Sequence, residues 1–141
     1  MAQGILDTNT LILLGRMTQT DALPAEPLIT AITLAELSVG PLVASTNEER
    51  AARQAHLQQA EADFDPLPFD AAAARSFGQV AARLRRAGRK PAARAYDAMI
   101  AAICIANDLP IHTCNPDDFA GIAGLVLVDV PQPDEGRIRG R

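Results

Sequence analysis

Short apolar runs alternate along the chain with longer segments that repeat apolar residues at helical spacing. Such runs, flanked by turn residues or polar clusters, are typical of buried strands, and the longer segments are typical of helices. The runs that predict strands lie at residues 4–6, 28–33, 109–113 and 125–128. Strands that alternate with helices favour right-handed crossovers and a parallel sheet between helical layers.

Capping residues mark where the helices should begin. Leu11 to Leu14 predict a short helix after the first strand, and Thr33 with Glu36 matches a capping box. Gly88 suits the position just after a helix, and residues 65–69 predict a proline-bounded link with a short extended piece. The expected starts of the longer helices are Thr33, Asn47, Asp70 and Pro91.

Composition fits one globular domain. The chain has 141 residues, of which 48% are hydrophobic and 21% charged. We expect an α/β fold with four or five parallel strands over residues 1–131, and a flexible tail over residues 132–141. There is no apolar run near the ~20 residues that span a bilayer, so we expect no membrane contact. Two cysteines and no recognisable targeting segment predict a cytoplasmic protein with reduced thiols.

Charge argues against a protein that simply coats nucleic acid. The 17 acidic residues outnumber the 13 basic ones, Trp is absent, and only one Tyr is present. However, six basic residues and no acid fall within residues 83–94, which predicts either a solvated helix end or a strip that binds RNA phosphates. These residues are Arg83, Arg85, Arg86, Arg89, Lys90 and Arg94.

Acidic residues follow the predicted strands. Asp7 comes after the first strand, Glu36 lies one turn into the helix after the second, and Asp117 and Asp118 follow the third. Because ligands bind outside the carboxyl ends of parallel strands, we expect these acids at one rim of the sheet. Asp97 lies on the apolar face of its helix, about two turns from the start, and should point inward.

Each acid is also compatible with an ordinary structural role. These roles are helix capping for Asp7, a capping box with Thr33 for Glu36, pairing with Arg94 for Asp97, and turn or cap positions for Asp117 and Asp118. However, two carboxylates ~4 Å apart repel by about 4 kcal/mol at an effective dielectric of 20. A shared site therefore needs a cation, and oxygen ligands select Mg²⁺ or Mn²⁺. His56 and His112 are interpreted as structural or surface residues.

The order and spacing of four motifs resemble the PIN domain, and most of all the toxins of bacterial toxin–antitoxin pairs. The resemblance covers the chain to about Pro131. The motifs are Ile5-Leu6-Asp7-Thr8-Asn9, Thr33-x-x-Glu36-Leu37, Ala95-Tyr96-Asp97-x-x-Ile100-Ala101-Ala102 and Thr113-x-Asn115-x-x-Asp118-Phe119.

The resemblance implies a three-layer fold with a five-stranded parallel sheet and an endoribonuclease that depends on Mg²⁺ or Mn²⁺. It implies hydrolysis of the RNA phosphodiester by a metal-activated water, leaving 5′-phosphate and 3′-hydroxyl ends. It also implies a cognate antitoxin that masks the site and a homodimer. Which RNA is cleaved, whether transfer, ribosomal or messenger RNA, stays open.

Site residues follow from the same resemblance. Asp7, Glu36 and Asp97 match the three central acids, and many relatives carry Asp where this chain has Asn115. Asp118 is then the expected fourth carboxylate, with Asp117 as the alternative. Asp7, Asp97 and Asp118 are the expected metal ligands. The expected supporting polar residues are Thr8, Asn9, Thr113 and Asn115.

Two other functions are compatible with parts of the sequence. Asp7-Thr8-Asn9-Thr10 is similar to the nucleophile loop of haloacid-dehalogenase-like phosphatases, but Asn9 stands where that family has its general acid. A PIN-like module that binds RNA or protein without catalysis would explain the neutral Asn115. A phosphorylated Asp7 would identify the first alternative, and weak Mn²⁺ binding the second.

Overall fold

The computed structural model describes residues 2–89 and 94–133. Short 3-10 turns at Leu14–Arg16, Gly40–Val43 and Pro116–Asp118 accompany the main elements within these ranges. The main elements are β1 (Gln3–Leu6), α1 (Thr8–Leu13), β2 (Glu26–Leu28), α2 (Ala31–Val39), α3 (Asn47–Asp63), α4 (Ala71–Arg86), α5 (Ala95–Ala106), β3 (Ile111–Thr113) and β4 (Leu127–Asp129). Across the described ranges, every helix is too short or too polar to cross a membrane.

The four strands pair in parallel in the order β2-β1-β3-β4. Ile5 of β1 lies between Leu28 and Ile111, so β1 is an inner strand. The parallel four-stranded sheet between helices confirms the expected fold class. No fifth strand is present among the described residues. The extended piece expected over 65–69 is present as one parallel bridge between Leu67 and Thr30.

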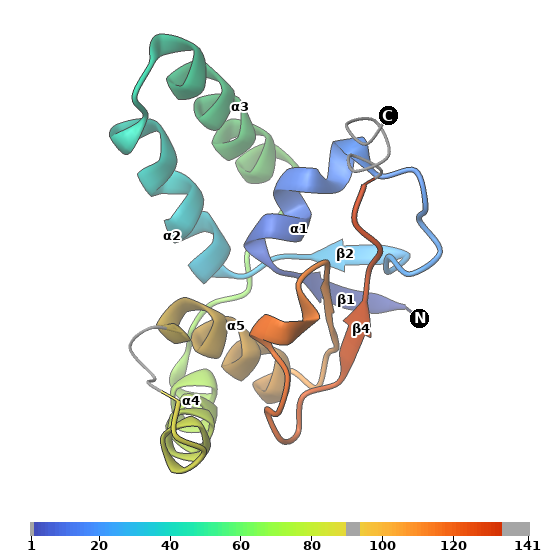
Figure 1. The fold of residues 1–141 in the computed structure, drawn as a ribbon, viewed down its shortest axis with the longest axis vertical. Coiled ribbons are helices and arrows are strands. Elements are labelled where there is room, and N and C mark those ends of the chain that lie inside the picture. Colours follow the sequence, from blue (N-terminus) through green and yellow to red (C-terminus); the bar gives the residue numbers. More distant parts are fainter. Residues whose placement is uncertain (1, 90–93, 134–141) are drawn as a thin grey trace.

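Helices lie on both sides of this sheet (Figure 1). One helical pair, α2 with α3, projects from one end of the molecule, and a second pair, α4 with α5, packs at the other. The main core joins β1 and β3 to α4 and α5 through Ile5, Ile111, Val80 and Ile100. A smaller core centred on Ile29, Leu37 and Ala60 holds α2 and α3 against α1. Both cysteines, Cys104 and Cys114, are free and buried.

The second strand is shorter than predicted, and the helix after it starts earlier. The β-branched run over 28–33 predicted a strand to Thr33, but the strand ends at Leu28 and α2 begins at Ala31. The reason is the cap: the Thr30 hydroxyl accepts a hydrogen bond from the Thr33 N–H at 3.3 Å. Thr33 is therefore inside the first turn, and the predicted capping box with Glu36 does not form.

Other predicted boundaries move by a few residues. Thr46, not Asn47, caps α3, because its hydroxyl accepts from the Glu49 N–H at 3.0 Å. Asp70 caps α4 as predicted, accepting from the Ala73 N–H, and Gly88 after α4 has a φ of +81°. The strands predicted over 109–113 and 125–128 are β3 (Ile111–Thr113) and β4 (Leu127–Asp129), so only their boundaries change.

The start of α5 changes the position predicted for Asp97. Among the described residues, α5 begins at Ala95, so Asp97 lies in the first turn and not about two turns in. The proposed start at Pro91 lies outside the described residues, as does Lys90. Most of the predicted C-terminal tail also lies outside them, although Gln132 is described and contacts the site below.

Candidate active site

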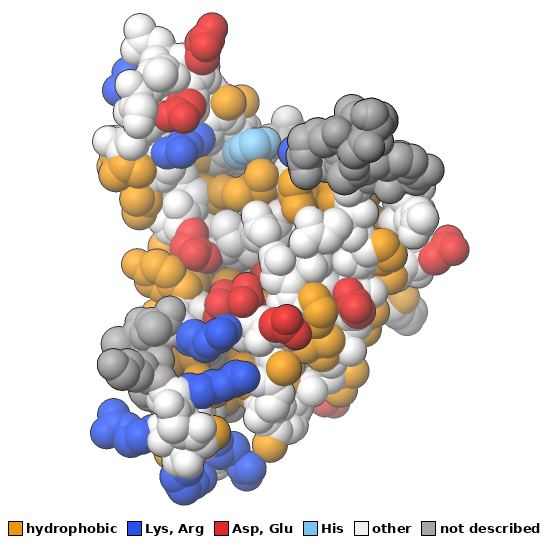
Figure 2. Space-filling view, viewed as in Figure 1, with side chains coloured by type: hydrophobic (Ala, Val, Ile, Leu, Met, Phe, Trp, Pro, Cys, Tyr) orange, Lys and Arg blue, Asp and Glu red, His pale blue; other side chains and the backbone are white. Residues whose placement is uncertain are grey.

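A hollow of about 280 Å³ lies where the carboxyl ends of β1 and β3 meet α1, the second turn of α2 and the start of α5. Figure 2 shows acidic side chains gathered at the centre of the face that includes this region, with basic side chains beside them over α4. We call this hollow the acidic cavity. Its lining residues are Asp7, Thr8, Asn9, Ile12, Glu36, Asp97, Asn115 and Asp118.

Asp7 is the most buried acid of the cavity, with 4% of its surface exposed. It follows β1 directly, and its carboxylate oxygen Oδ2 accepts a hydrogen bond from the Thr113 hydroxyl at 3.0 Å. The other oxygen, Oδ1, is buried without a hydrogen-bond partner among the described residues. Burial raises the pKa of Asp7, and hydrogen bonds to the carboxylate offset only part of this effect. An unpartnered buried oxygen is costly, so this atom is suited to a ligand.

Glu36 is held by a short chain of hydroxyl groups. The Thr8 hydroxyl donates to Glu36 Oε1 at 2.5 Å, and its oxygen lies 2.9 Å from the hydroxyl of the fully buried Thr33. Because Thr8 has one hydroxyl proton and gives it to Glu36, Thr33 must donate to Thr8. The chain Thr33–Thr8–Glu36 therefore joins α1 to α2 and orients the Glu36 carboxylate in the cavity.

Asp97 is half-buried and surrounded by like charge. Burial and then the neighbouring carboxylates of Asp118, Glu36 and Asp7 raise its pKa to about 6. Arg94 does not pair with it among the described contacts. Instead, Arg94 Nη1 lies 3.5 Å from Asp118 Oδ1 and donates to the Asp118 carbonyl at 3.3 Å.

The loop after β3 brings Asn115 and Asp118 to the cavity but leaves Asp117 outside its lining, with an exposed side chain. The Asn115 N–H donates to the Thr113 hydroxyl at 2.9 Å, and that hydroxyl donates to Asp7. The structure thus brings together the predicted Asp7, Glu36, Asp97 and Asp118, in one cavity.

Two residues at this site were missed by sequence reasoning. Ile12 lines the acidic cavity because helical spacing places it one turn after Thr8. Gln132 lies in the segment interpreted as a tail, yet its Nε2 donates to the Cys114 carbonyl at 3.3 Å and to Asn115 Oδ1 at 3.4 Å. The helical spacing could have indicated Ile12, whereas no local pattern marks Gln132.

The donor set suits a hard cation, although its present arrangement does not complete a coordination shell. Within residues 2–89 and 94–133, no three His, Cys, Asp or Glu side chains are arranged to hold one metal ion. The orphaned Asp7 Oδ1 and the mutual repulsion felt by Asp97 nevertheless fit a cation in this cavity. Water molecules commonly complete the shell of Mg²⁺, so three protein ligands at full contact are not required.

The basic residues lie at the neighbouring helix end. Arg83, Arg85 and Arg86 are exposed in the last turn of α4. Arg89 follows, and its Nη1 donates to the Ala120 carbonyl at 3.1 Å. Arg94 reaches the cavity itself through Asp118. The described part of the predicted strip therefore runs from the end of α4 to the acidic cavity.

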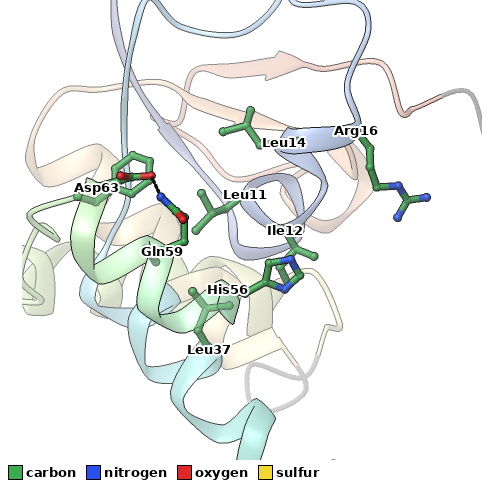
Figure 3. Close-up of a pocket in the computed structure, with 11 residues that line it drawn as sticks. Leu11, Ile12, Leu14, Arg16, Leu37, His56, Gln59 and Asp63 are labelled. Carbon is green, nitrogen blue, oxygen red and sulfur yellow. Dashed lines mark hydrogen bonds between the residues drawn. The ribbon is translucent and has the colours of Figure 1, made fainter. Parts of the chain in front are cut away.

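A second, larger cavity of about 540 Å³ lies between α1, α2 and α3. It is mainly apolar and shares Ile12 with the acidic cavity. Figure 3 shows Leu11 and Ile12 of α1 facing Gln59 and His56 of α3, with Leu37 of α2 between the helices. We call it the apolar cavity.

Comparisons with known proteins agree with this geometry. Residues 5–125 match the sequence profile of the PIN domain. The chain is 38% identical over 131 residues to Ribonuclease VapC5 of Mycobacterium tuberculosis, covering 92% of this chain and 94% of that protein. It also resembles the crystal structure of VapBC-5, a member of the VapBC family of toxin–antitoxin systems from M. tuberculosis, with a TM-score of 0.76, 34% identity, and coverage of 92% and 100%. DNA-bound VapBC from Salmonella typhimurium matches with a TM-score of 0.69, 27% identity, and coverage of 92% and 98%.

Proposed function

The chain belongs to the PIN-domain family, and from this premise we propose that it is an endoribonuclease and the toxin of a type II toxin–antitoxin pair. Similarity to Ribonuclease VapC5 and to VapBC structures supports the reaction class and the biological setting. The observation that carries the proposal is the buried, unpartnered Asp7 Oδ1 in a cavity with three further acids. The alternative of a haloacid-dehalogenase-like phosphatase is not supported, because residues 5–125, which include the loop that resembles that family, match the PIN domain instead.

Three carboxylates are proposed to hold a divalent cation, Mg²⁺ or Mn²⁺. Asp7 offers its free Oδ1, the neighbouring carboxylates raise the pKa of Asp97, and Asp118 lines the same cavity. When bound, such an ion would supply positive charge against the RNA phosphate and make a water molecule more acidic. Asp118 is favoured over Asp117 because only Asp118 lines the cavity.

The other side chains are proposed to position the reactants. Glu36, oriented by Thr8, accepts the proton of the attacking water through its carboxylate. Thr113 holds Asp7 through Oδ2, so that Oδ1 stays directed to the ligand. Asn9, which is exposed at the cavity edge, contacts the RNA.

The basic residues beside the cavity are proposed to bind RNA phosphates. Arg85 and Arg86 are exposed at the end of α4, where no core packing requires a long charged side chain. Arg89 and Arg94 continue toward the acids. Lys90 belongs to this predicted set but lies outside the described residues. An acidic metal site with adjacent cations suits a charged polynucleotide substrate.

The experiment that tests the proposed activity is cleavage of a random-sequence fluorogenic RNA pool. We expect cleavage with Mg²⁺ or Mn²⁺, loss of cleavage in EDTA, and a rate at least 100-fold lower for Asp7→Asn. Asp118→Ala should lower the rate far more than Asp117→Ala, its matched control. Wild-type protein without cleavage would favour the binding module, and cleavage unaffected by EDTA would contradict the proposed metal dependence.

The antitoxin is proposed to bury an apolar segment in the apolar cavity. His56 and Gln59 lie exposed at its rim, so His56→Glu and Gln59→Glu change the rim without removing core contacts. We expect these variants to bind the antitoxin at least tenfold more weakly while cleaving RNA normally. Equal antitoxin binding would place its contact elsewhere.

A homodimer is proposed through the exposed apolar side chains at the end of α2 and in the 3-10 turn that follows it. Val39, Leu42 and Val43 are 50%, 84% and 64% exposed, a grouping that is unusual for a monomer surface. Leu42→Glu should convert the dimer to a monomer in sedimentation velocity. A wild-type monomer at high concentration would contradict this part of the proposal.

A further inference from the structure

Gln132 has an amide orientation that is fixed by chemistry. Its side chain contacts both the Cys114 carbonyl, at 3.3 Å, and the Asn115 side chain, at 3.4 Å. A carbonyl oxygen only accepts hydrogen bonds, so the atom of Gln132 that faces Cys114 must be the donor Nε2. The same Nε2 faces Asn115, and Asn115 must therefore present its acceptor Oδ1.

This contact fixes the orientation of Asn115 in turn. With Oδ1 directed to Gln132, the Nδ2 group is left on the other side of the amide, and no described residue accepts a hydrogen bond from it. The Asn115 main chain is held separately, because its N–H donates to the Thr113 hydroxyl at 2.9 Å. Asn115 lines the acidic cavity, so the cavity contains an oriented and unpartnered donor.

A donor among carboxylates suits an anion and not a cation. Oδ1 would be the metal-binding atom of an Asn side chain, and here it accepts a hydrogen bond from Gln132. Nδ2 can instead donate to a phosphate oxygen of the RNA. A carboxylate at position 115 has no proton to give and would repel that oxygen, so a neutral amide performs this role where Asp would not.

From these contacts we infer that Gln132 is a positioning residue, which orients the Asn115 amide so that Nδ2 binds a non-bridging phosphate oxygen of the RNA. The inference rests on the proposed ribonuclease function. It assigns substrate binding, and not metal binding, to the position where many relatives carry an acid.

The test compares Gln132→Met, Gln132→Glu and Asn115→Ala in cleavage of the random-sequence RNA pool. Gln132→Met removes the donor at similar volume, and we expect KM to rise about fivefold with kcat nearly unchanged. Gln132→Glu presents only acceptors to Cys114 and Asn115 and should raise KM further. In the Asn115→Ala background, Gln132→Met should have no added effect, because it acts through Asn115.

The control is Asn107→Leu, which removes a comparable side-chain amide hydrogen bond, 2.8 Å to the Ile103 carbonyl, at a residue outside the lining of the acidic cavity. Its KM should equal that of the wild type. The Mn²⁺ concentration for half-maximal rate should be the same in all Gln132 variants. Equal KM for Gln132→Met and wild type, additive effects with Asn115→Ala, or an altered Mn²⁺ requirement would each overturn the inference.

A measurement without RNA separates this inference from the proposed activity. The side-chain amide resonances of Asn115 should shift in Gln132→Met, whereas those of Asn9, on α1, should not. Unchanged Asn115 resonances would overturn the orientation by Gln132 whatever the activity. A wild-type protein that cleaves no RNA would overturn the proposed function and the phosphate contact, while these resonances would still decide the orientation.

Discussion

Replacing Asp97 with Asn should stabilise the metal-free protein at neutral pH, although it removes a proposed functional group. Burial and the carboxylates of Asp118, Glu36 and Asp7 raise the pKa of Asp97 from its ordinary value of 3.8 to about 6. That difference corresponds to about 3 kcal/mol against the ionised folded state. Because the side chain is half-buried and solvent screens its neighbours, we expect about 1 kcal/mol.

The sign of the pH dependence follows from proton binding. Between about pH 4 and pH 6, the unfolded chain ionises Asp97 while the folded protein keeps it protonated. The folded state therefore binds more protons, and this residue makes the wild type less stable as pH rises through that window. Above about pH 6 both states are ionised and the full penalty remains. The advantage of Asp97→Asn should thus be absent at pH 4 and complete at pH 7.5.

Urea denaturation followed by far-UV circular dichroism, with EDTA present, measures this difference. Asp97→Asn should raise the free energy of unfolding by about 1 kcal/mol at pH 7.5 and leave it unchanged at pH 4. Asp117→Asn is the matched control, because Asp117 is exposed outside the cavity, and it should change neither value. Destabilisation by Asp97→Asn at pH 7.5, or an equal gain at both pH values, would refute the reasoning.

Three further predictions concern separate parts of the chain. Excess Mn²⁺, at 100 times the dissociation constant, should raise the free energy of unfolding of the wild type by about 2.7 kcal/mol and so raise its melting temperature, and Asp7→Asn should lose most of that response in thermal-shift assays. Replacing Arg85 and Arg86 with Gln should flatten the salt dependence of RNA binding, by about 0.7 in log–log slope per lost phosphate contact. Asp108 has a φ of +56° at the end of α5, so Asp108→Gly should stabilise the protein by about 0.5 kcal/mol in urea denaturation without changing cleavage.

Much of the site could be predicted because strand ends and acids are both visible in the sequence. Asp7 directly follows an apolar run, and parallel topology then places it beside the residues that follow β3. Gly88 was also predicted correctly, since a positive φ after a helix favours glycine. Asp7 could be placed from its position after an apolar run and the rule that the carboxyl ends of parallel strands share one edge of the sheet, and Gly88 from the local pattern at a helix end.

Other features could not be predicted, because two residues were equally able to cap one helix or because the contact joins residues distant in sequence. Thr30 and Thr33 are both able to cap a helix, and only the structure shows that Thr30 does so. Arg94 precedes Asp97 by three residues but contacts Asp118, because the loop after β3 packs against the start of α5. Gln132 contacts Asn115, a lining residue of the cavity, from a segment rich in Pro, Gly and Arg, a composition that predicts a tail. Helical spacing and composition describe neighbouring residues only. They do not show which of two possible caps forms, or which distant residue a side chain contacts.

The position of β3 inside the sheet determines when the acidic cavity can assemble as the chain folds. β3 lies between β1 and β4, so the sheet stays open until the final part of the chain has folded. Until β3 has paired with β1, Asp7 lacks the hydrogen bond that the Thr113 hydroxyl donates to it. Because such long-range pairing forms late, an incomplete chain on the ribosome has no assembled cavity. A chain folded only as far as α5 contains Asp7, Glu36 and Asp97 but not Asn115 and Asp118, so the proposed ribonuclease would gain its complete site only with the last two strands.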